Sequence, residues 1–491
     1  MSWRAFGLIA LGLSSAACSP SGSVPAEAPP RAAAVPGVVG KSSVEWLVTT
    51  GDEHLAKRAV TSAGTSEPAP STAVEVRIDP AQAFQTMQGF GGAFNEHGWD
   101  ALGVLDAAER AQVLRALFDP EQGLGFNYCR VPIGASDYAI DRYTLDETPG
   151  DFAMDQFSIA RDRERLIPYI QAARSIRPDL KLWGSAWTPP TWMKTNQSFD
   201  SGAMKDDTLV YAAYALYLAR FVEEYAREGL NISMLVPQNE PGQLTRYPSC
   251  DWTPNQYITF IRDHLGPTFR KRRLRTDIYV GTVNRPEWDA LSVLNDPEAR
   301  SYVSGIALQW FGLSHAGPIL SAYPQLTFMQ SETDCGNHPW EPEFQPETPQ
   351  NDFTYAAYTF RKFRDYIQAG ASSYMLWNMV LDEHGKNLDS QLPWPQNSAI
   401  VVDRQTRQVT YTPLYWMTKH FSSLVRPGAQ RIATLSSYAD QIAFKNPDGT
   451  LIVELLNEGN SPIDLQVQAG QRRHLVQLPA QSFATLVIPK T

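Results

Sequence analysis

ISMLVPQNEP, residues 232–241, begins with a short apolar run that is followed within a few residues by a glutamate. LTFMQSET, residues 326–333, repeats this arrangement. Apolar runs of this length, bounded by polar residues and proline, are typical of strands buried in a parallel sheet. Glu240 and Glu332 directly follow the two runs. Because the carboxyl ends of parallel strands meet at one edge of a sheet, the two stretches predict a pair of carboxylates at that edge.

Similar apolar runs occur eight times between residues 81 and 424, and helical patterns separate most of them. The runs span Gly89–Phe94, Phe126–Ile133, Leu180–Trp187, Ile232–Gln238, Asp277–Val283, Val303–Trp310, Leu326–Gln330 and Tyr374–Val380. Helical patterns with one apolar face cover residues 157–177, 208–228 and 352–369. Eight strands that alternate with helices predict an α/β fold of the (β/α)8 TIM-barrel type over residues 81–424.

The periodicity changes to two after residue 425, which is the pattern of half-buried strands. Strands are predicted at Gln441–Phe444, Leu451–Leu456, Ile463–Val467, His474–Leu478 and Phe483–Ile488. Two alternating segments near the other end of the chain, at 44–48 and 74–78, need sheet partners. We therefore expect an antiparallel β-sandwich built from both chain ends, residues 41–80 and 425–491, with the barrel inserted between them.

The first 17 residues resemble a secretory signal peptide. Arg4 precedes an apolar segment, and the small residues at 15–17 form a cleavage site. Cys18 follows at once, as in a bacterial lipoprotein signal, although Ser15 stands where such signals usually carry leucine. Residues 18–40 are rich in Pro, Ala and Ser, which is typical of a flexible linker. We expect export, either as a lipoprotein of the bacterial cell envelope or as a secreted protein.

Composition excludes several classes of function. The net charge is −10 and no basic run is present, so we expect no nucleic-acid partner. The eight histidines form no cluster with ligand spacing, so we expect no metal. No other cofactor is expected either, because two carboxyl groups and a water suffice for the hydrolysis considered below. The apolar run of the signal is too short for a stable span, so a membrane is reached only through a lipid on Cys18. Cys129, Cys250 and Cys335 are expected to be buried structural thiols. One disulfide in an oxidising compartment is the alternative, and the sequence does not assign its partners.

The two glutamates fit one kind of chemistry. Two carboxyl groups about 5–5.5 Å apart can hydrolyse a glycosidic bond with retention, one as proton donor and one as nucleophile. Glu240 ends the fourth predicted strand and Glu332 the seventh, so both can face a sugar at the barrel mouth. Because Asn239 can bond a sugar hydroxyl beside Glu240, we assign Glu240 as the acid/base and Glu332 as the nucleophile. The alternative is that either one is a structural surface carboxylate.

Other strand ends supply polar and aromatic side chains. Asp137 can bond sugar hydroxyls, and Trp187, Trp310 and Trp377 offer aromatic surface of the kind that suits sugar rings. Arg130 has two possible roles. It can pair with a catalytic carboxylate and lower its pKa, or it can belong to a structural ion pair.

Several motifs, taken in order, resemble glycoside hydrolase family 30, the family of glucosylceramidase. They are Gly89–Phe94, Arg130–Pro132, Trp187–Asn196, Asn239–Pro241, Ser331–Glu332, Trp377–Asn378 and Gln396–Asp403. The resemblance covers residues 86–491 and implies a barrel with a side β-sandwich, an acid/base at Glu240 and a nucleophile at Glu332. Further positions match residues that line the family's sugar-binding subsite: Asp137, Trp187, Asn239, Trp377 and Asn397.

One motif departs from the family pattern. Glucosylceramidase-like members read His-Trp-Tyr at the sixth strand, whereas this chain has Gln309-Trp310-Phe311. Loss of the tyrosine hydroxyl removes a donor near the nucleophile and disfavours its charged form. The resemblance implies hydrolysis of a β-linked carbohydrate or glycoconjugate, foremost a β-glucoside such as glucosylceramide or β-1,6-glucan. A xylan- or β-xyloside-active member and a non-catalytic carbohydrate-binding lipoprotein are the alternatives.

Overall fold

The computed structural model describes residues 43–64 and 73–490. The expected signal peptide at 1–17, Cys18 and the expected linker at 18–40 lie outside these residues. No helix within the two described ranges has both the length and the apolar character that crossing a bilayer requires.

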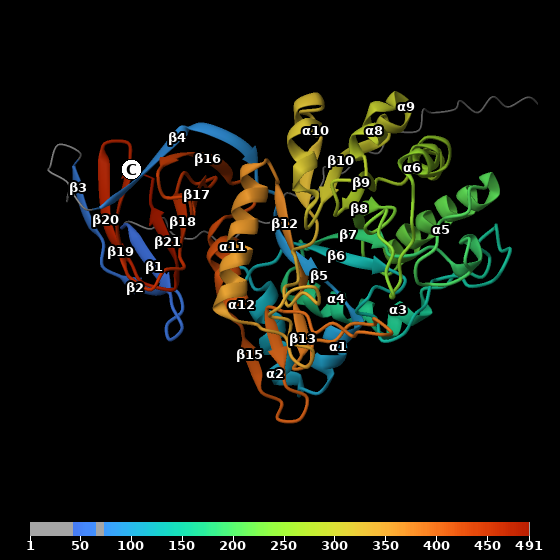
Figure 1. Cartoon of the computed structure of the whole chain (residues 1–491), viewed down its shortest axis with the longest axis horizontal. Coiled ribbons are helices and arrows are strands. Elements are labelled where there is room, and N and C mark those ends of the chain that lie inside the picture. The colour runs from blue at the N-terminus through green and yellow to red at the C-terminus, as the bar shows by residue number, and fades with distance from the viewer. Residues whose placement is uncertain (1–42, 65–72, 491) are drawn as a thin grey trace, which may run out of the picture. The chain divides into compact units, whose positions relative to one another are not determined.

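Eight parallel strands close into a barrel (Figure 1). They are β5 (Gly89–Ala93), β6 (Tyr128–Ile133), β7 (Lys181–Ala186), β8 (Ile232–Val236), β9 (Asp277–Val283), β10 (Val303–Leu308), β11 (Thr327–Gln330) and β12 (Ser373–Asn378). All eight predicted runs are confirmed as barrel strands. Large side chains such as Trp183, Tyr279 and Met375 fill a separate buried cluster contributed by the barrel strands, so the barrel is a packed core rather than a channel.

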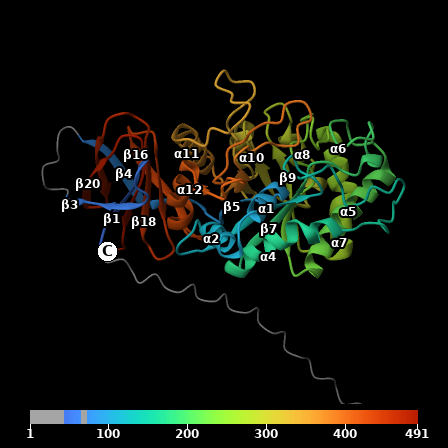
Figure 2. The same ribbon diagram turned by 90° about the horizontal axis from the view of Figure 1, so that it is seen from below.

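Helices surround the barrel strands (Figure 2). They are α1 (Glu96–Gly103), α2 (Ala107–Phe118), α3 (Ala160–Glu164), α4 (Leu166–Ile176), α5 (Thr208–Arg227), α6 (Pro254–Thr259), α7 (Gly266–Arg272), α8 (Ala290–Asn295), α9 (Pro297–Arg300), α10 (Ala316–Ala322), α11 (Phe353–Gln368) and α12 (Pro413–Leu424). α5 illustrates why they form. Asp207 caps its first turn by accepting from the backbone N–H groups of Leu209 and Val210, and its buried residues recur every three or four positions.

A ten-stranded sheet from both chain ends forms the sandwich. Its strands are, in hydrogen-bonded order, β2 (Ala56–Arg58), β1 (Glu45–Thr49), β21 (Ser482–Ile488), β18 (Leu451–Asn457), β17 (Gln441–Lys445), β16 (Gln430–Ser436), β4 (Val74–Thr86), β19 (Ile463–Ala469), β20 (Arg472–Leu478) and β3 (Thr61–Gly64). Strands from both halves of this order share one core. The predicted sandwich is therefore confirmed, with one addition: β4 and β19 pair in parallel.

A small sheet that the periodicity did not reveal follows the last barrel strand. It consists of β13 (Val380–Asp382), β14 (Ile400–Val402) and β15 (Val409–Tyr411), each only three residues long. Strands this short carry too few residues for an alternating pattern to be recognised.

α11 and α12 pack against the sandwich. Phe353 of α11 contacts Phe483 with ring centroids 5.0 Å apart, and Arg364 pairs with Asp440. The buried His420 of α12 is hydrogen-bonded on both ring nitrogens, 2.7 Å from Thr485 Oγ1 and 2.8 Å from Thr49 Oγ1. These contacts join the barrel's helical layer to both chain ends.

Candidate active site

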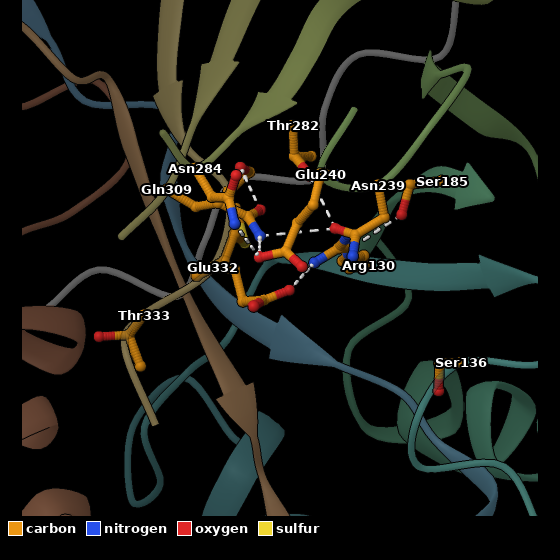
Figure 3. Close-up of polar contacts among 12 residues, drawn as sticks. Arg130, Ser136, Ser185, Asn239, Glu240, Thr282, Asn284, Gln309, Glu332 and Thr333 are labelled. Atoms are coloured by element: carbon orange, nitrogen blue, oxygen red, sulfur yellow. Dashed lines mark hydrogen bonds and ion pairs between the residues drawn. The ribbon is translucent and has the colours of Figure 1, made fainter. Parts of the chain in front are cut away.

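Glu240 follows β8 and Glu332 follows β11, and both carboxylates lie together at the mouth of the barrel (Figure 3). The backbone continues the sheet hydrogen bonding beyond the strand end, since the Asn239 N–H donates to Ala186 O at 2.6 Å and the Glu240 N–H to Thr282 O at 3.0 Å. Glu240 itself has φ of 50°, a left-handed conformation that non-glycine residues seldom adopt. Such strain concentrates at functional sites, where the surrounding structure holds it in place.

Glu332 is bound by a cation and an indole. Arg130 Nη1 lies 2.5 Å from Glu332 Oε2, and Trp310 Nε1 donates to Glu332 Oε1 at 2.8 Å. Arg130 is 0% exposed. Both donors stabilise the charged form of the carboxylate. Glu332 is therefore held as an anion more strongly than a carboxylate with neutral partners.

The Arg130 guanidinium is fixed on every side. Its Nε donates to Ser185 Oγ at 2.8 Å and its Nη2 to Asn239 Oδ1 at 2.6 Å. Its Cζ lies 4.3 Å from the ring centroid of Trp187. The two roles considered for Arg130 thus coincide, because it forms a buried ion pair and its partner is the candidate nucleophile.

Glu240 has only neutral donors among its direct hydrogen bonds. Asn284 Nδ2 donates to Glu240 Oε1 at 2.8 Å, and Gln309 Nε2 donates to the same oxygen at 3.2 Å. Both bonds use Oε1, which leaves Oε2 as the oxygen that can carry a proton. The Gln309 amide is held in turn by Ser331 Oγ, which donates to Gln309 Oε1 at 3.1 Å.

Burial and like charge separate the protonation of the two glutamates. Burial raises the pKa of Glu240 to about 8, and the negative charges of Glu332 and Asp137 act in the same direction. Burial also raises the pKa of Glu332, but Arg130 and the Trp310 N–H oppose that rise. Because only Glu332 is paired with the cation, the first charge of the pair settles on Glu332 and the proton stays on Glu240.

Asp137, Trp187 and Trp377 lie around this pair. Burial, and then the charge of Glu332, raises the pKa of Asp137 to about 7. Trp187 and Trp377 are each 2% exposed and stack on each other with centroids 5.2 Å apart. Their faces are occupied by one another and by Arg130 rather than left open. In this structure the two rings support Arg130, and their stacking on a sugar stays a prediction.

The sixth strand is followed by Trp310 with φ of 52°, and this turn places its indole on Glu332. Phe311 points elsewhere: it is 53% exposed and contacts Lys362, whose Nζ is 5.5 Å from the ring centroid. The hydrogen-bond donor to Glu332 at this strand end is therefore Trp310, which the motif retains.

The hydrogen bonds of Asn397 are to neighbouring loop residues rather than to the glutamates. Its Oδ1 accepts from the Asn351 N–H at 2.7 Å, and its own N–H donates to Cys335 O at 3.2 Å. The structure thus joins Glu240, Glu332, Asn239 and Trp310 in one hydrogen-bonded group. The Nδ2 of Asn397 is buried without a partner among the described residues, and its contact with a sugar stays a prediction.

Sequence reasoning missed three residues that contact this group: Asn284, Ser185 and Thr282. Asn284 is the first polar residue after the apolar run of β9, so the rule that identified the glutamates was available for it as well. The Ser185 hydroxyl and Thr282 Oγ1, which donates to Asn239 Oδ1 at 2.7 Å, lie within strands and gave no such signal.

The three cysteines of the described residues are buried and unpaired. This confirms their interpretation as structural thiols. In residues 43–64 and 73–490, no group of three or more His, Cys, Asp or Glu side chains is arranged to hold a metal ion.

Comparisons with known proteins agree with this geometry. The sequence matches the family model described as the glycosyl hydrolase family 30 TIM-barrel domain over residues 87–425, and the family 30 beta sandwich domain over residues 428–486. Lysosomal acid glucosylceramidase of Mus musculus is 30% identical over 424 residues, which cover 81% of this chain and 79% of the mouse protein. Endo-1,6-beta-D-glucanase neg1 of Aspergillus fumigatus is 25% identical over 474 residues, 90% of this chain and 93% of the fungal protein.

Among solved structures, SrfJ from Salmonella typhimurium has the same fold, with a TM-score of 0.82 and 23% identity over 91% of this chain and all of the other. The family-30 matches span both the barrel and the sandwich. The chain therefore belongs to glycoside hydrolase family 30, and it is a glycosidase whose substrate is a β-linked carbohydrate or glycoconjugate.

Proposed function

We propose that this glycosidase works by double displacement, with Glu332 as the nucleophile and Glu240 as the acid/base. One observation carries the assignment: the two buried carboxyls have unlike partners. Glu332 is paired with the Arg130 guanidinium, whereas Glu240 receives its hydrogen bonds from the neutral amides of Asn284 and Gln309. A retaining glycosidase needs one ionised and one protonated carboxyl at the same pH, and these environments supply them.

In the first step the Glu332 carboxylate attacks the anomeric carbon while the Glu240 carboxyl gives its proton to the departing glycosidic oxygen. The C–O bond to the aglycone breaks, and a glycosyl ester forms on Glu332. Asn239 is held by Arg130 and Thr282 beside both groups, where its amide can bond a sugar hydroxyl. A hydrogen bond there that strengthens in the transition state contributes to catalysis.

In the second step water attacks the anomeric carbon of the glycosyl ester, the bond from that carbon to the Glu332 oxygen breaks, and Glu240 accepts the proton that the water loses. Esterification removes the negative charge of Glu332, which is one of the causes that raise the pKa of Glu240. The pKa of Glu240 therefore falls once the intermediate has formed, and the same side chain changes from acid to base. This exchange needs no group beyond the two glutamates and a water molecule.

We propose a β-glucoside as the substrate, either a glucosylceramide-like glycolipid or a β-1,6-glucan. The support is the sequence similarity over most of the chain to a protein named as a glucosylceramidase and to one named as an endo-1,6-β-glucanase. Asp137, buried beside Glu332, is proposed to bond the hydroxyls of the glycone. Activity on xylan or β-xylosides is the alternative, and comparing rates on glucosides with rates on xylosides distinguishes the two.

The test is hydrolysis of aryl β-glucosides, aryl β-xylosides, glucosylceramide and β-1,6- and β-1,4-linked oligosaccharides, with the product anomer followed by proton NMR. We expect the β anomer to form first, and glucosides to be preferred over xylosides. Initial formation of the α anomer would contradict double displacement. Preference for xylosides would contradict the proposed glycone and leave the mechanism intact.

We also propose that the protein is exported and carries a lipid on Cys18. The support is the apolar segment that precedes the small residues at 15–17 and the cysteine that follows them. Mass spectrometry of the mature protein from a bacterial host tests this. We expect diacylglyceryl-modified Cys18 at the N-terminus and its loss in Cys18→Ser, whereas an unmodified N-terminus at residue 18 would indicate plain secretion.

A further inference from the structure

A cavity of about 700 Å³ opens at one end of the sandwich, and all its lining residues belong to the sandwich strands and their turns. Register explains how it arises. Ala443 of β17 and Val476 of β20 face the shared core, and these strands continue at the same parity to Lys445 and Arg472, while Lys490 lies two residues after the end of β21. The inward-facing positions therefore change from apolar to cationic where the two layers end.

The mouth of the cavity is positively charged. Lys445, Arg472 and Lys490 line it together, and its lining contains no aspartate or glutamate. None of the three has an ion-pair partner among the described residues. Three like charges around one hollow repel each other unless an anion lies between them, and the chain as a whole carries a net charge of −10. Local charge of this sign in an acidic protein favours an anionic ligand.

A buried histidine forms part of the inner wall. His474 is 0% exposed, and its Nδ1 is 2.9 Å from Ser62 Oγ. Its Nε2 is buried and has no hydrogen-bond partner among the described residues. A buried polar atom without a partner is costly, and such atoms in native proteins call for an explanation. If the Ser62 hydroxyl donates to Nδ1, Nε2 carries the hydrogen and is left as an unpaired donor buried in the wall of the cavity.

The remaining lining is apolar and shaped by a tight turn. Leu451 and Ile488 form the inner part of the wall, with Pro447 and Pro489 nearer the rim. Gly449 has φ of +87°, and a Cβ on it would lie 2.7 Å from Lys490 Cδ. The aliphatic part of Lys490 therefore packs on this glycine, which defines where that cation leaves the wall.

We infer that this cavity is a binding site for an anionic group, a phosphate or a carboxylate, on a ligand distinct from the substrate. Lys445, Arg472 and Lys490 would contact the anion, His474 Nε2 would donate to one of its oxygens, and Leu451 and Ile488 would contact the body of the ligand. Three sources carry such a group: a free anion, an acidic sugar or an anionic lipid headgroup. The proposal is independent of the reaction at Glu240 and Glu332.

Titration calorimetry of the full chain at low ionic strength tests the site with inorganic phosphate and with glucuronate. Flotation of the Cys18→Ser protein, which carries no lipid of its own, with phosphatidylglycerol-containing and pure phosphatidylcholine vesicles tests a lipid headgroup. The variant Arg472→Gln/Lys490→Gln changes two exposed side chains. The matched control Lys271→Gln/Arg275→Gln removes the same charge from an exposed part of the barrel. His474→Asn keeps an amide near Nδ1 and removes Nε2.

We expect one of the three probes to bind, with at least tenfold weaker binding in Arg472→Gln/Lys490→Gln and in His474→Asn, and a change of less than about twofold in the control. Added salt should weaken the binding. Hydrolysis of an aryl β-glucoside should be unchanged in the double variant, which separates this site from the catalytic one. Absence of binding by all three probes, or equal loss in the control, would overturn the proposal.

Discussion

Two buried glutamates, Glu240 at the barrel mouth and Glu454 in the sandwich, differ in what surrounds them. Burial raises the pKa of each to about 8. Glu240 lies beside a second carboxylate, an arginine and two amides. Glu454 accepts a hydrogen bond at 2.5 Å from Thr485 Oγ1, and its other oxygen has no partner among the described residues. The same pKa therefore arises from two different environments.

The comparison shows that a raised pKa is not by itself the mark of a catalytic acid. Thr485 also contacts His420, whose pKa burial lowers to about 3, so this region holds two titratable groups in their neutral forms. At the barrel mouth a fixed cation keeps one carboxyl charged, and that charge helps to keep the other protonated. Catalysis needs this difference between neighbours, and the sandwich glutamate has no such neighbour.

The sharpest test of the comparison is Glu332→Gln. We expect kcat/KM for an aryl β-glucoside to fall by about 10⁴-fold or more, because the covalent step loses its nucleophile. The matched control is Glu454→Gln, which makes the same chemical change in the sandwich and should leave kcat/KM unchanged. Activity near that of the wild type in Glu332→Gln, measured on protein free of wild-type contamination, would remove Glu332 from the nucleophile role.

Glu240→Gln should have the next largest effect, and one that depends on the leaving group. Loss of the proton donor should lower the rate by about 10²–10⁴-fold on a β-linked disaccharide and much less on an aryl glucoside with an acidic phenol. The reason is that a good leaving group departs without protonation. Rates on a series of phenols of different pKa check this. Equal losses along the whole series would show that Glu240 is not the acid.

Trp310→Phe should give a smaller effect with a defined pH signature. It removes one N–H donor from Glu332 Oε1, which disfavours the charged nucleophile and raises its pKa. We expect kcat/KM to fall by about ten- to a hundredfold, the value of a hydrogen bond to a charged group of about 1.5–3 kcal/mol. The acid limb of its pH profile should move to higher pH.

Phe311→Tyr is the control for this indole, because residue 311 is half exposed and its ring contacts Lys362. Its pH profile should match that of the wild type. A shift of the acid limb to lower pH would show instead that a hydroxyl at residue 311 reaches the nucleophile.

The smallest effect on activity, and a clear one on stability, belongs to Glu454→Gln. In the folded protein Glu454 keeps its proton up to about pH 8, whereas its ordinary pKa is 4.5. Between these values the folded state binds more protons than the unfolded state. Its contribution is therefore complete below about pH 4.5 and is lost as the pH rises through 8. We expect Glu454→Gln to remove this pH-dependent loss of unfolding free energy, which is on the order of a few kcal/mol.

Denaturant unfolding of the wild type and the variant at pH 5 and pH 8 measures this pH-dependent loss of stability. The free energy of unfolding of the variant minus that of the wild type should be larger, meaning a relatively more stable variant, at pH 8 than at pH 5. The same difference at both pH values would mean that Glu454 is already ionised in the folded protein.

Much of the fold was open to prediction because its signals are local. The apolar runs of β8 and β11 and the period-two segments of β17 and β18 carry their own periodicity. The three-residue strands β13, β14 and β15 do not, and neither does the parallel pairing of β4 with β19, which joins segments almost 400 residues apart. Pairing between distant strands depends on how the whole sheet closes, and no window of sequence contains that information.

The site divides in the same way. Glu240, Glu332 and Asn239 stand out in the sequence because each is a polar residue directly after a buried strand, and Trp310 could be named from its motif. The register around the closed barrel decides the partners of these groups. It pairs Arg130 with Glu332 and Asn284 with Glu240, and it stacks Trp187 on Trp377. The sequence by itself therefore determined the fold class and the pair of glutamates. Only the tertiary structure decided which of them holds the charge, because burial and the distance to a cation are properties of the assembled barrel.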